Sequence, residues 1–258
     1  MKTIILLISV LFSDLLFADL PANDLWQYDN KNSFMGIDES QFNAAIKEVS
    51  DIYSPIARAM GFTLNIDGNW SDSTVNAYTQ RNGNEWYVAM FGGLARREEV
   101  TKDGFKLVIC HEIAHQMGGY PMDDWAAYEG QADYVATHVC GKKVFRQAAL
   151  DGDDLVMAIP RKCLVFSSLV DQKVCMKNLA AGQSLGNLLA ALRKSPLPSY
   201  ETPDTSVVTS TQQAHPAAQC RLDSYLAGTV CTKPWDDSEI PNNANAVCDN
   251  RPKCWFYK

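Results

Sequence analysis

Apolar and polar residues follow two different periods along the chain, and the change of period separates a helix from a sheet. Downstream of Asp38, apolar residues recur every three or four positions, which places them on one face of an α-helix. Asp38 and Gln41 have the spacing of a capping box, and Gly61 is a typical helix stop. We therefore expect an amphipathic helix from Asp38 to Gly61, whose buried face carries Phe42, Ile46, Val49, Ile52, Tyr53, Ile56 and Met60.

After Gly61 the pattern changes to a period of two, in segments rich in β-branched and aromatic residues. These segments are FTLNID (62–67), STVNAYTQ (73–80) and EWYVAMFGGLA (85–95), and the turn sequence RNGN joins the second to the third. Alternation of this kind is typical of strands, and an Asn-Gly pair between two strands indicates a hairpin. We expect the three segments to form a small antiparallel sheet.

Helical spacing returns after residue 104, in two segments that a short connection separates. The first, FKLVICHEIAHQMGG (105–119), is stopped by paired glycines and by Pro121. The second contains WAAYEGQADYVATHVC and is expected to run from Asp123 or Asp124 to Gly141. Beyond it we expect a cysteine-bearing segment up to Cys175, a short amphipathic helix at 185–192, a surface loop rich in Pro, Ser and Thr at 195–213, and a short helix at 218–228.

A small sheet accompanied by separate helices indicates an α+β fold, with the sheet packed on the two helices that the connection joins. The length of 258 residues suits one domain of moderate size. We expect residues 19–258 to form that single domain, with a core at 38–145 and a cysteine-rich, disulfide-containing C-terminal part at 160–258.

Residues 1–18 have the layout of a secretory signal peptide. Lys2 precedes the apolar run Ile4–Phe12, and the small residue Ala18 offers a cleavage site before Asp19. The apolar run is much shorter than a bilayer requires, which argues against a membrane span. A buried N-terminal helix is the alternative interpretation.

The cysteine content agrees with export to the periplasm or to the extracellular space. The chain has eight cysteines, an even number that, behind an export signal, predicts disulfides in an oxidising compartment. A thiolate zinc site is the alternative, but the chain has no paired CxxC spacing. Short loops favour the pairs Cys163–Cys175, Cys220–Cys231 and Cys248–Cys254, and Cys110 is expected to be structural.

The charge balance narrows the choice of partners. The formal net charge is −7 and the isoelectric point is about 5.1. An acidic chain without a long run of Lys and Arg is a poor match for nucleic acid or for an anionic membrane surface. We expect neither as the main partner.

The strongest chemical signal is the sequence HEIAH at residues 111–115. The chain has only four histidines, and His111 and His115 lie four residues apart, so both imidazoles project from one face of a helix and can bind one ion. Glu112 lies about 100° further round the helix, which suits a base that takes a proton from an attacking water. A catalytic zinc ion commonly has three protein ligands, so this reading requires a third ligand nearby.

The second helix offers that ligand in the sequence EGQAD. Glu129 and Asp133 are again four residues apart, and Gly118 and Gly119 let the chain turn back so that the two helices can lie face to face. Glu129 would complete a His₂Glu set for one Zn²⁺ ion. Asp133 would accept the remaining N–H of His111 and so fix its tautomer. The two helices are then an active-site helix and a second metal-ligand helix.

The alternative is an amphipathic helix that contains the HExxH pattern by chance. Carboxylates at helical spacing, such as Glu129 and Asp133, are common on surface helices. The flanking residues are apolar, however, and burying two histidines and a glutamate without partners would be costly. The conjunction of ligand pair, third carboxylate and supporting carboxylate favours a metal site.

The motifs resemble those of the gluzincin zinc metallopeptidases. HEIAH followed by EGQAD is similar to their zinc-binding motifs, and VNAYTQRNGNEWYVAMFGGLARR is similar to the branch that contains the CAAX prenyl endopeptidases and their soluble periplasmic relatives. The segment from His215 to Arg221 fits a later HPxxxxR motif. The resemblance covers residues 74–140 and 215–226. The cysteine framework and the lack of a sequence segment apolar enough to span a membrane differ from the membrane members, so prenylated substrates are not carried over.

The resemblance implies roles for further residues. The edge strand near Asn76, Ala77 and Tyr78 would bind an extended peptide through backbone hydrogen bonds, a mode available to any sheet edge. His215 would donate a hydrogen bond to the developing oxyanion, and Arg221 would position nearby groups. His138 is assigned no role.

These observations predict an exported zinc-dependent metalloendopeptidase that acts on protein or peptide substrates. Two alternatives stay open. One is a zinc-containing binding or quality-control module without activity, and the other is a zinc amidase that acts on peptidoglycan cross-bridges. An intact Glu112 argues against the first, because a purely structural zinc site needs no base.

Overall fold

The computed structural model describes residues 17–18, 36–150, 160–235 and 247–258. The proposed signal segment therefore lies outside the described residues, except for its last two positions. In chain order the elements are β1 (Phe17–Ala18), α1 (Glu39–Ala59), β2 (Thr63–Asn69), β3 (Ala77–Asn82), β4 (Glu85–Phe91), α2 (Gly92–Ala95), α3 (Lys102–Met117), β5 (Met122–Asp123), β6 (Ala126–Ala127), α4 (Glu129–Val135), the π-helix η1 (Ala136–Gly141), α5 (Lys142–Leu150), the 3₁₀-helix η2 (Arg161–Val165), α6 (Leu169–Arg193) and α7 (Ala218–Val230).

The main sheet is mixed, where the strand pattern had predicted a wholly antiparallel one. Its order is β1-β3-β4-β2. β3 and β4 form the expected hairpin, with Gly83 at a φ of 59° in its turn, and β1 pairs antiparallel with β3. β2 runs parallel to β4 because the chain passes over one strand position after β2, and β4 then returns into that position.

The first helix agrees with its sequence pattern. α1 begins after Asp38, whose carboxylate accepts a hydrogen bond from the backbone N–H of Gln41 at 2.8 Å, while the Gln41 side chain accepts one from the N–H of Asp38 at 3.1 Å. Both halves of the predicted capping box are therefore present. The buried residues of α1, among them Phe42, Val49 and Tyr53, face the sheet and α3.

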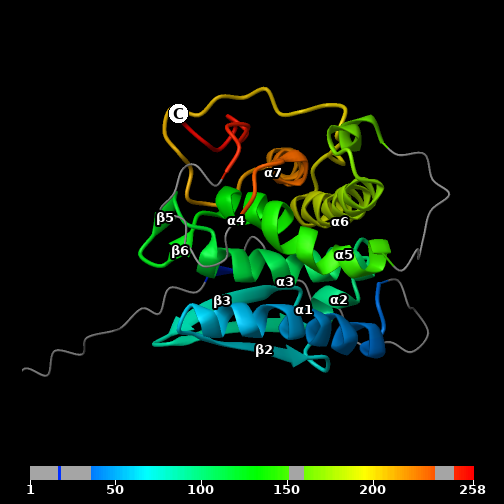
Figure 1. Ribbon diagram of the computed structural model, residues 1–258, viewed down its shortest axis with the longest axis vertical. Helices are drawn as coiled ribbons and strands as arrows, with labels where there is room; N and C mark the ends of the chain where they lie inside the picture. Colours follow the sequence, from blue (N-terminus) through cyan, green and yellow to red (C-terminus); the bar gives the residue numbers. More distant parts are fainter. Residues whose placement is uncertain (1–16, 19–35, 151–159, 236–246) are drawn as a thin grey trace, which may run out of the picture.

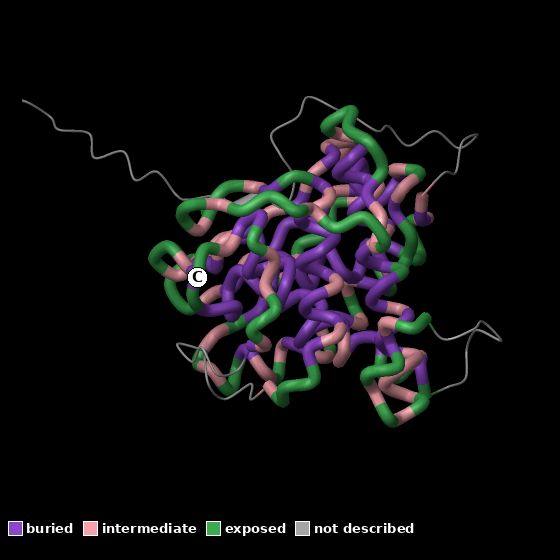
Figure 2. The backbone as a smooth tube through the Cα atoms, turned by 90° about the horizontal axis from the view of Figure 1, so that it is seen from above, coloured by how far each residue is buried: buried purple, intermediate pink, exposed green. Residues whose placement is uncertain are grey.

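The molecule is layered around α3 (Figure 1). The main sheet and α1 lie on one side of α3, and α4, α6 and α7 lie on the other. Every residue of α3 from Gly104 to Met117 is buried, and Figure 2 shows the buried backbone gathered in the middle of the molecule. The polar side chains on this part of the helix are therefore held in the protein interior.

Several helix boundaries differ from the predicted ones. The second metal-ligand helix begins at Glu129, because residues 122–127 form the small hairpin of β5 and β6, with Asp124 at a φ of 48°. It continues through the π-helix, which ends at Gly141, and then into α5. The end of the cysteine-bearing segment, with Cys175, and the short helix near residue 185 are one helix, the 25-residue α6, while Cys163 lies in η2. The end of the third predicted strand is the single helical turn α2.

All eight cysteines form disulfides, which are Cys110–Cys140, Cys163–Cys175, Cys220–Cys254 and Cys231–Cys248. The predicted pair Cys163–Cys175 is confirmed. The predicted pairs Cys220–Cys231 and Cys248–Cys254 are wrong, because Cys220 and Cys231 lie at opposite ends of α7 and the straight helix holds them apart. The C-terminal segment instead folds back along α7 and bonds to both ends.

The predicted α+β class is confirmed. Helices and a small sheet share one continuous core that extends from α1 to residue 247. No helix among the described residues has both the length and the apolar character needed to cross a membrane.

Candidate metal centre

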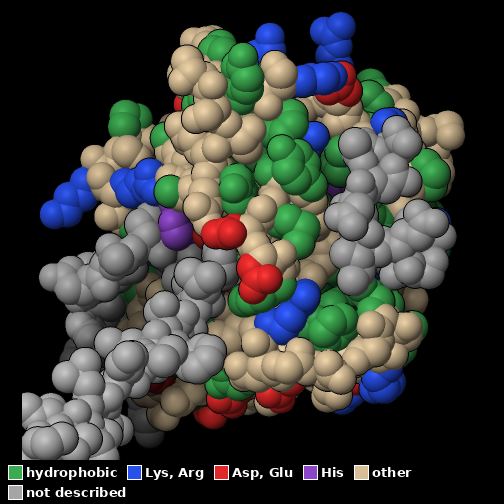
Figure 3. Space-filling view, turned by 90° about the vertical axis from the view of Figure 1, so that its left-hand side faces the viewer, with side chains coloured by type: hydrophobic (Ala, Val, Ile, Leu, Met, Phe, Trp, Pro, Cys, Tyr) green, Lys and Arg blue, Asp and Glu red, His purple; other side chains and the backbone are tan. Residues whose placement is uncertain are grey.

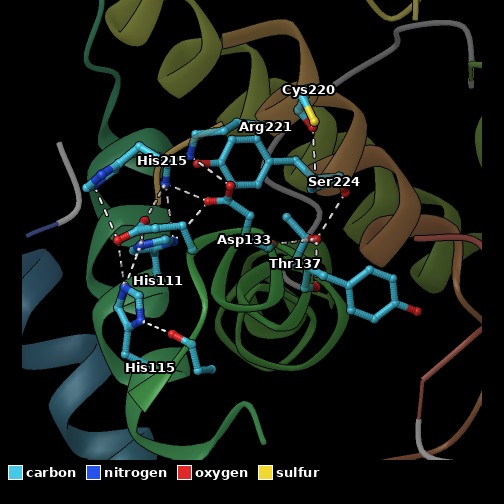
Figure 4. Close-up of polar contacts among 12 residues, drawn as sticks. His111, His115, Asp133, Thr137, His215, Cys220, Arg221 and Ser224 are labelled. Carbon is cyan, nitrogen blue, oxygen red and sulfur yellow. Dashed lines mark hydrogen bonds and ion pairs between the residues drawn. The ribbon is translucent and has the colours of Figure 1, made fainter. Parts of the chain in front are cut away.

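The face of α3 that points away from the sheet meets the start of α4, and three candidate ligands converge there. His111 and His115 project from α3 (Figure 4). Glu129 is the first residue of α4. One nitrogen of each histidine and one oxygen of Glu129 all lie within 4.8 Å of one another. All three residues are buried. The grouping that the HExxH and EGQAD motifs predict is thus present.

Hydrogen bonds at the far side of each ring determine which nitrogen faces the cluster. His115 Nδ1 lies 2.7 Å from the carbonyl oxygen of Ala127, and His111 Nδ1 lies 2.9 Å from Asp133 Oδ1. A carbonyl and a carboxylate only accept hydrogen bonds, so both Nδ1 atoms carry the proton. In the neutral rings both Nε2 atoms therefore present lone pairs, and these atoms lie 3.0 Å apart.

Glu129 places a negative charge next to these two Nε2 lone pairs. Its carboxylate oxygens lie 3.3 Å from His111 Nε2 and 3.7 Å from His115 Nε2. Burial alone would raise the pKa of Glu129, but the neighbouring histidines and Arg221 outweigh burial and lower it, so the carboxylate is ionised. Three electron-donating atoms in a dry interior repel one another unless a cation lies between them.

The donor set suits zinc. Protein zinc sites are tetrahedral with nitrogen and oxygen ligands at about 2.0–2.2 Å, which puts neighbouring ligand atoms roughly 3.3 Å apart. The two histidine Nε2 atoms lie 3.0 Å apart, and Glu129 approaches them with different oxygens, Oε2 at 3.3 Å from His111 and Oε1 at 3.7 Å from His115, so each of these separations is close to that value. Two imidazoles and one carboxylate also leave one position of a tetrahedron for water or substrate. Other divalent ions bind such sets as well.

Asp133 also forms a buried ion pair, in which Arg221 and His111 share the carboxylate oxygen Oδ1. Arg221, from α7, donates from Nε to Asp133 Oδ2 at 2.7 Å and from Nη2 to Oδ1 at 2.6 Å, and both side chains are fully buried (Figure 4). Burial alone would raise the pKa of Asp133, but the Arg221 guanidinium and the hydrogen bond from His111 hold it well below its usual range. A permanently ionised Asp133 keeps His111 in one tautomer and makes its Nε2 a stronger donor to a metal.

We expect Asp133→Asn to weaken zinc affinity by about 10- to 100-fold, the usual cost of removing a carboxylate behind a ligating histidine. The amide is similar in shape but cannot supply the negative charge that polarises His111. Competition with a chromogenic chelator measures the affinity, and Asp51→Asn on the exposed surface of α1 is the matched control. Equal affinities in the two variants would contradict this role of Asp133.

The other predicted site residues lie at different distances from the cluster of His111, His115 and Glu129. His215 Nε2 lies 3.2 Å from Glu129 Oε1 and its side chain is 24% exposed, so it lies at the solvent side of the site. Glu112 is fully buried on α3, next to His111 in the helix. Ala77 and Tyr78 belong to β3, with Asn76 just before it, and none of the three is part of the ligand cluster.

Several contributors to the site carry no recognisable signal in the sequence. The carbonyl of Ala127 depends on the β5–β6 hairpin, which forms only in the folded chain. Arg193, at the end of α6, is close enough to Arg221 and Glu129 for their charges to act on its pKa, which burial lowers. Trp255 is fully buried against Gly130, where any side chain would overlap its indole ring.

Two disulfides involve cysteines that directly precede site residues in the sequence. Cys110 precedes His111 and joins α3 to the π-helix, while Cys220 precedes Arg221 and joins α7 to Cys254. Each bond therefore tethers the helix that carries a site residue to an element from another part of the chain. The expectation that Cys110 is structural agrees with this bond.

On the face drawn in Figure 3, the Lys and Arg side chains of the described residues are interspersed with acidic, hydrophobic and polar ones.

Comparisons of the chain with protein families, with curated proteins and with solved structures found no match. The functional argument therefore rests on the chemistry of the site.

Proposed function

We propose that this protein is an exported zinc-dependent metalloendopeptidase. The observation that carries the proposal is the convergence of two imidazole lone pairs and an ionised carboxylate in the interior, with Glu112 buried on α3 next to His111 in the chain. A structural role for such a set would not require an additional buried acid next to the ligands. The four disulfides support export, because such bonds persist in oxidising compartments.

His111, His115 and Glu129 would hold the zinc ion. When bound, zinc lowers the pKa of water from about 15.7 towards 7 and polarises a carbonyl group. Glu112 would accept the proton of the attacking water and pass it to the leaving amine. His215, at the solvent side of Glu129, would donate a hydrogen bond to the oxygen that becomes negative as the peptide carbonyl is attacked.

The outer edge of β3 is the candidate substrate-binding strand. Its residue Tyr78 pairs with Ala89 of β4 on one side and with Ala18 of β1 on the other. The pairing with β1, only two residues long, supports the idea that this edge accepts an extended segment in the antiparallel direction. Removal of residues 1–18 by signal cleavage would free the same edge for a substrate.

We expect the mature, zinc-loaded protein to hydrolyse an unfolded protein substrate, to lose that activity on treatment with a chelator, and to regain it when zinc is added back. His115→Ala is expected to lose both the metal and the activity, because only two ligands would remain. Mass spectrometry of the products and metal analysis of the same samples measure the two properties. Full hydrolysis by the metal-free protein would overturn the proposal.

Zinc bound to the wild-type protein without hydrolysis of any unfolded protein would instead favour the non-catalytic zinc module. Release of fragments from muropeptides alone would favour the amidase. Both substrates should therefore be offered in parallel to the same preparation.

A further inference from the structure

Side-chain hydrogen bonds join the end of α3 to β3, the candidate substrate strand. Gln116 directly follows His115 in the chain, and its side chain reaches the main sheet. The Gln116 amide donates to Thr79 Oγ1 at 2.7 Å and to the carbonyl oxygen of Gln80 at 2.9 Å, and both partners belong to β3. Gln116 is almost wholly buried, so water has little access to these bonds.

Arg81, also in β3, bonds to the same glutamine. Its Nε donates to Gln116 Oε1 at 3.1 Å, and its Nη2 donates to the backbone carbonyl oxygen of Gln116 at 2.8 Å. That carbonyl lies in the last turn of α3, where carbonyl groups have no partner within the helix. We call these bonds of Arg81 and Gln116 the Arg81–Gln116 link. Because an arginine only donates, it also fixes which end of the Gln116 amide faces the strand.

The same arginine contacts the hairpin that supports His115. The guanidinium carbon of Arg81 lies 5.3 Å from the centre of the Trp125 ring, between β5 and β6. Burial lowers the pKa of Arg81, and the nearby carboxylate of Asp124 in the same hairpin opposes this effect. Ala127, two residues after Trp125, supplies the carbonyl oxygen next to His115 Nδ1. The link therefore connects β3, α3 and the hairpin around one of the three candidate metal ligands.

A peptide bound along β3 needs a fixed position relative to the metal. Each residue of an extended strand advances by about 3.3 Å, and a slip of one residue turns every side chain to the other face. A shift of β3 along α3 would therefore bring a different part of the substrate to the metal. A displacement of about 1 Å at the reacting atoms is enough to lower a rate by about 10²-fold.

We propose that Gln116 and Arg81 are positioning residues, which hold β3 at one place relative to the metal ligands and so fix which peptide bond of an extended substrate is cut. The inference rests on the peptidase function and the substrate strand proposed above. Neither side chain belongs to the ligand cluster, so each can be replaced without removing a metal ligand.

The position of β3 can be measured separately from activity. Co²⁺ in place of zinc produces paramagnetic NMR shifts that depend on the distance and direction of each backbone amide from the metal. We expect Gln116→Leu to change these shifts at Thr79 and Gln80 and to leave the shift at Tyr134, in α4, as it is. Gln183→Leu, which removes a hydrogen-bonded amide from α6, is the matched control and should change none of them. Unchanged shifts at β3 in a folded Gln116→Leu protein would overturn the proposal.

The sites of cleavage test the consequence for the substrate. An unfolded protein is digested by each zinc-loaded variant, and mass spectrometry identifies the bonds that are cut. We expect Gln116→Leu to lower kcat/KM by about 10- to 100-fold and to add cuts one or two residues away from the wild-type sites. A purely structural role would reduce the amount of active protein without moving the cuts. Cuts confined to the wild-type sites would therefore contradict the assignment.

Arg81→Met covers the case in which Gln116→Leu does not fold, and the same changes in shifts and in cut sites are expected of it. The double variant should be little worse than either single one, because both remove the same link. Arg81→Lys keeps one donor for the Gln116 carbonyl and should restore part of the wild-type pattern. If the wild-type protein cuts no substrate, the peptidase function fails, while the Co²⁺ shifts still show whether the link positions β3.

Discussion

Replacing Glu112 by glutamine is expected to lower the rate of peptide hydrolysis by about 10²- to 10⁴-fold while the protein keeps its zinc. Glutamine has nearly the same size and fits the same buried position. It cannot accept a proton from water, so the step in which water attacks the carbonyl loses its base. His111, His115 and Glu129 are unchanged, so the metal should stay.

The measurement is turnover of an unfolded protein together with the zinc content of the same preparation. Glu39→Gln, at the exposed start of α1, is a control for a loss of negative charge elsewhere. A Glu112→Gln protein that binds zinc and still turns over at the wild-type rate would show that another group is the base. Loss of zinc would instead place Glu112 among the groups that hold the metal.

Replacing Arg221 by methionine is expected to lower the free energy of unfolding by about 3–5 kcal/mol, the largest stability effect that the structure predicts. Arg221 and Asp133 are both fully buried, and removal of the arginine leaves an ionised carboxylate in the interior. The carboxylate must then take up a proton or remain unpaired, and either change disturbs His111. Methionine fills most of the vacated space, which limits the contribution of a cavity.

Denaturant unfolding of the metal-free protein measures this effect without a contribution from zinc binding. Arg58→Met, an exposed change near the end of α1, should alter stability by less than about 0.5 kcal/mol. The double variant Arg221→Met with Asp133→Leu removes both charges and should recover part of the loss. A single variant as stable as Arg58→Met would contradict the importance of the ion pair.

The grouping of ligands was predictable because it is encoded locally. His111 and His115 share a helix face through their spacing of four, and Glu129 and Asp133 do the same in the next helix. The glycines after α3 indicated that the chain turns back. These signals depend only on helix geometry and on a short connection between the two helices. The predicted grouping is therefore correct although α4 begins several residues later than predicted.

The parts that escaped prediction depend on contacts between distant segments. Loop length favoured Cys220–Cys231, but α7 separates these residues by its own length, and each bonds to the returning C-terminal segment instead. The Ala127 carbonyl depends on a hairpin of two-residue strands, too short to produce a pattern.

The packing of Trp255 on Gly130 has a consequence for the order in which the parts of the site are made and assembled. Trp255 and Cys254 cover the start of α4 and are joined to α7, which carries Arg221, so the support of His111 is complete only after this late segment has docked. During synthesis, His111, His115 and Glu129 are all made well before Trp255. Under the peptidase function proposed above, a nascent chain would therefore carry its metal ligands before their support is complete, and cleavage of neighbouring chains would begin only after the C-terminal segment had docked.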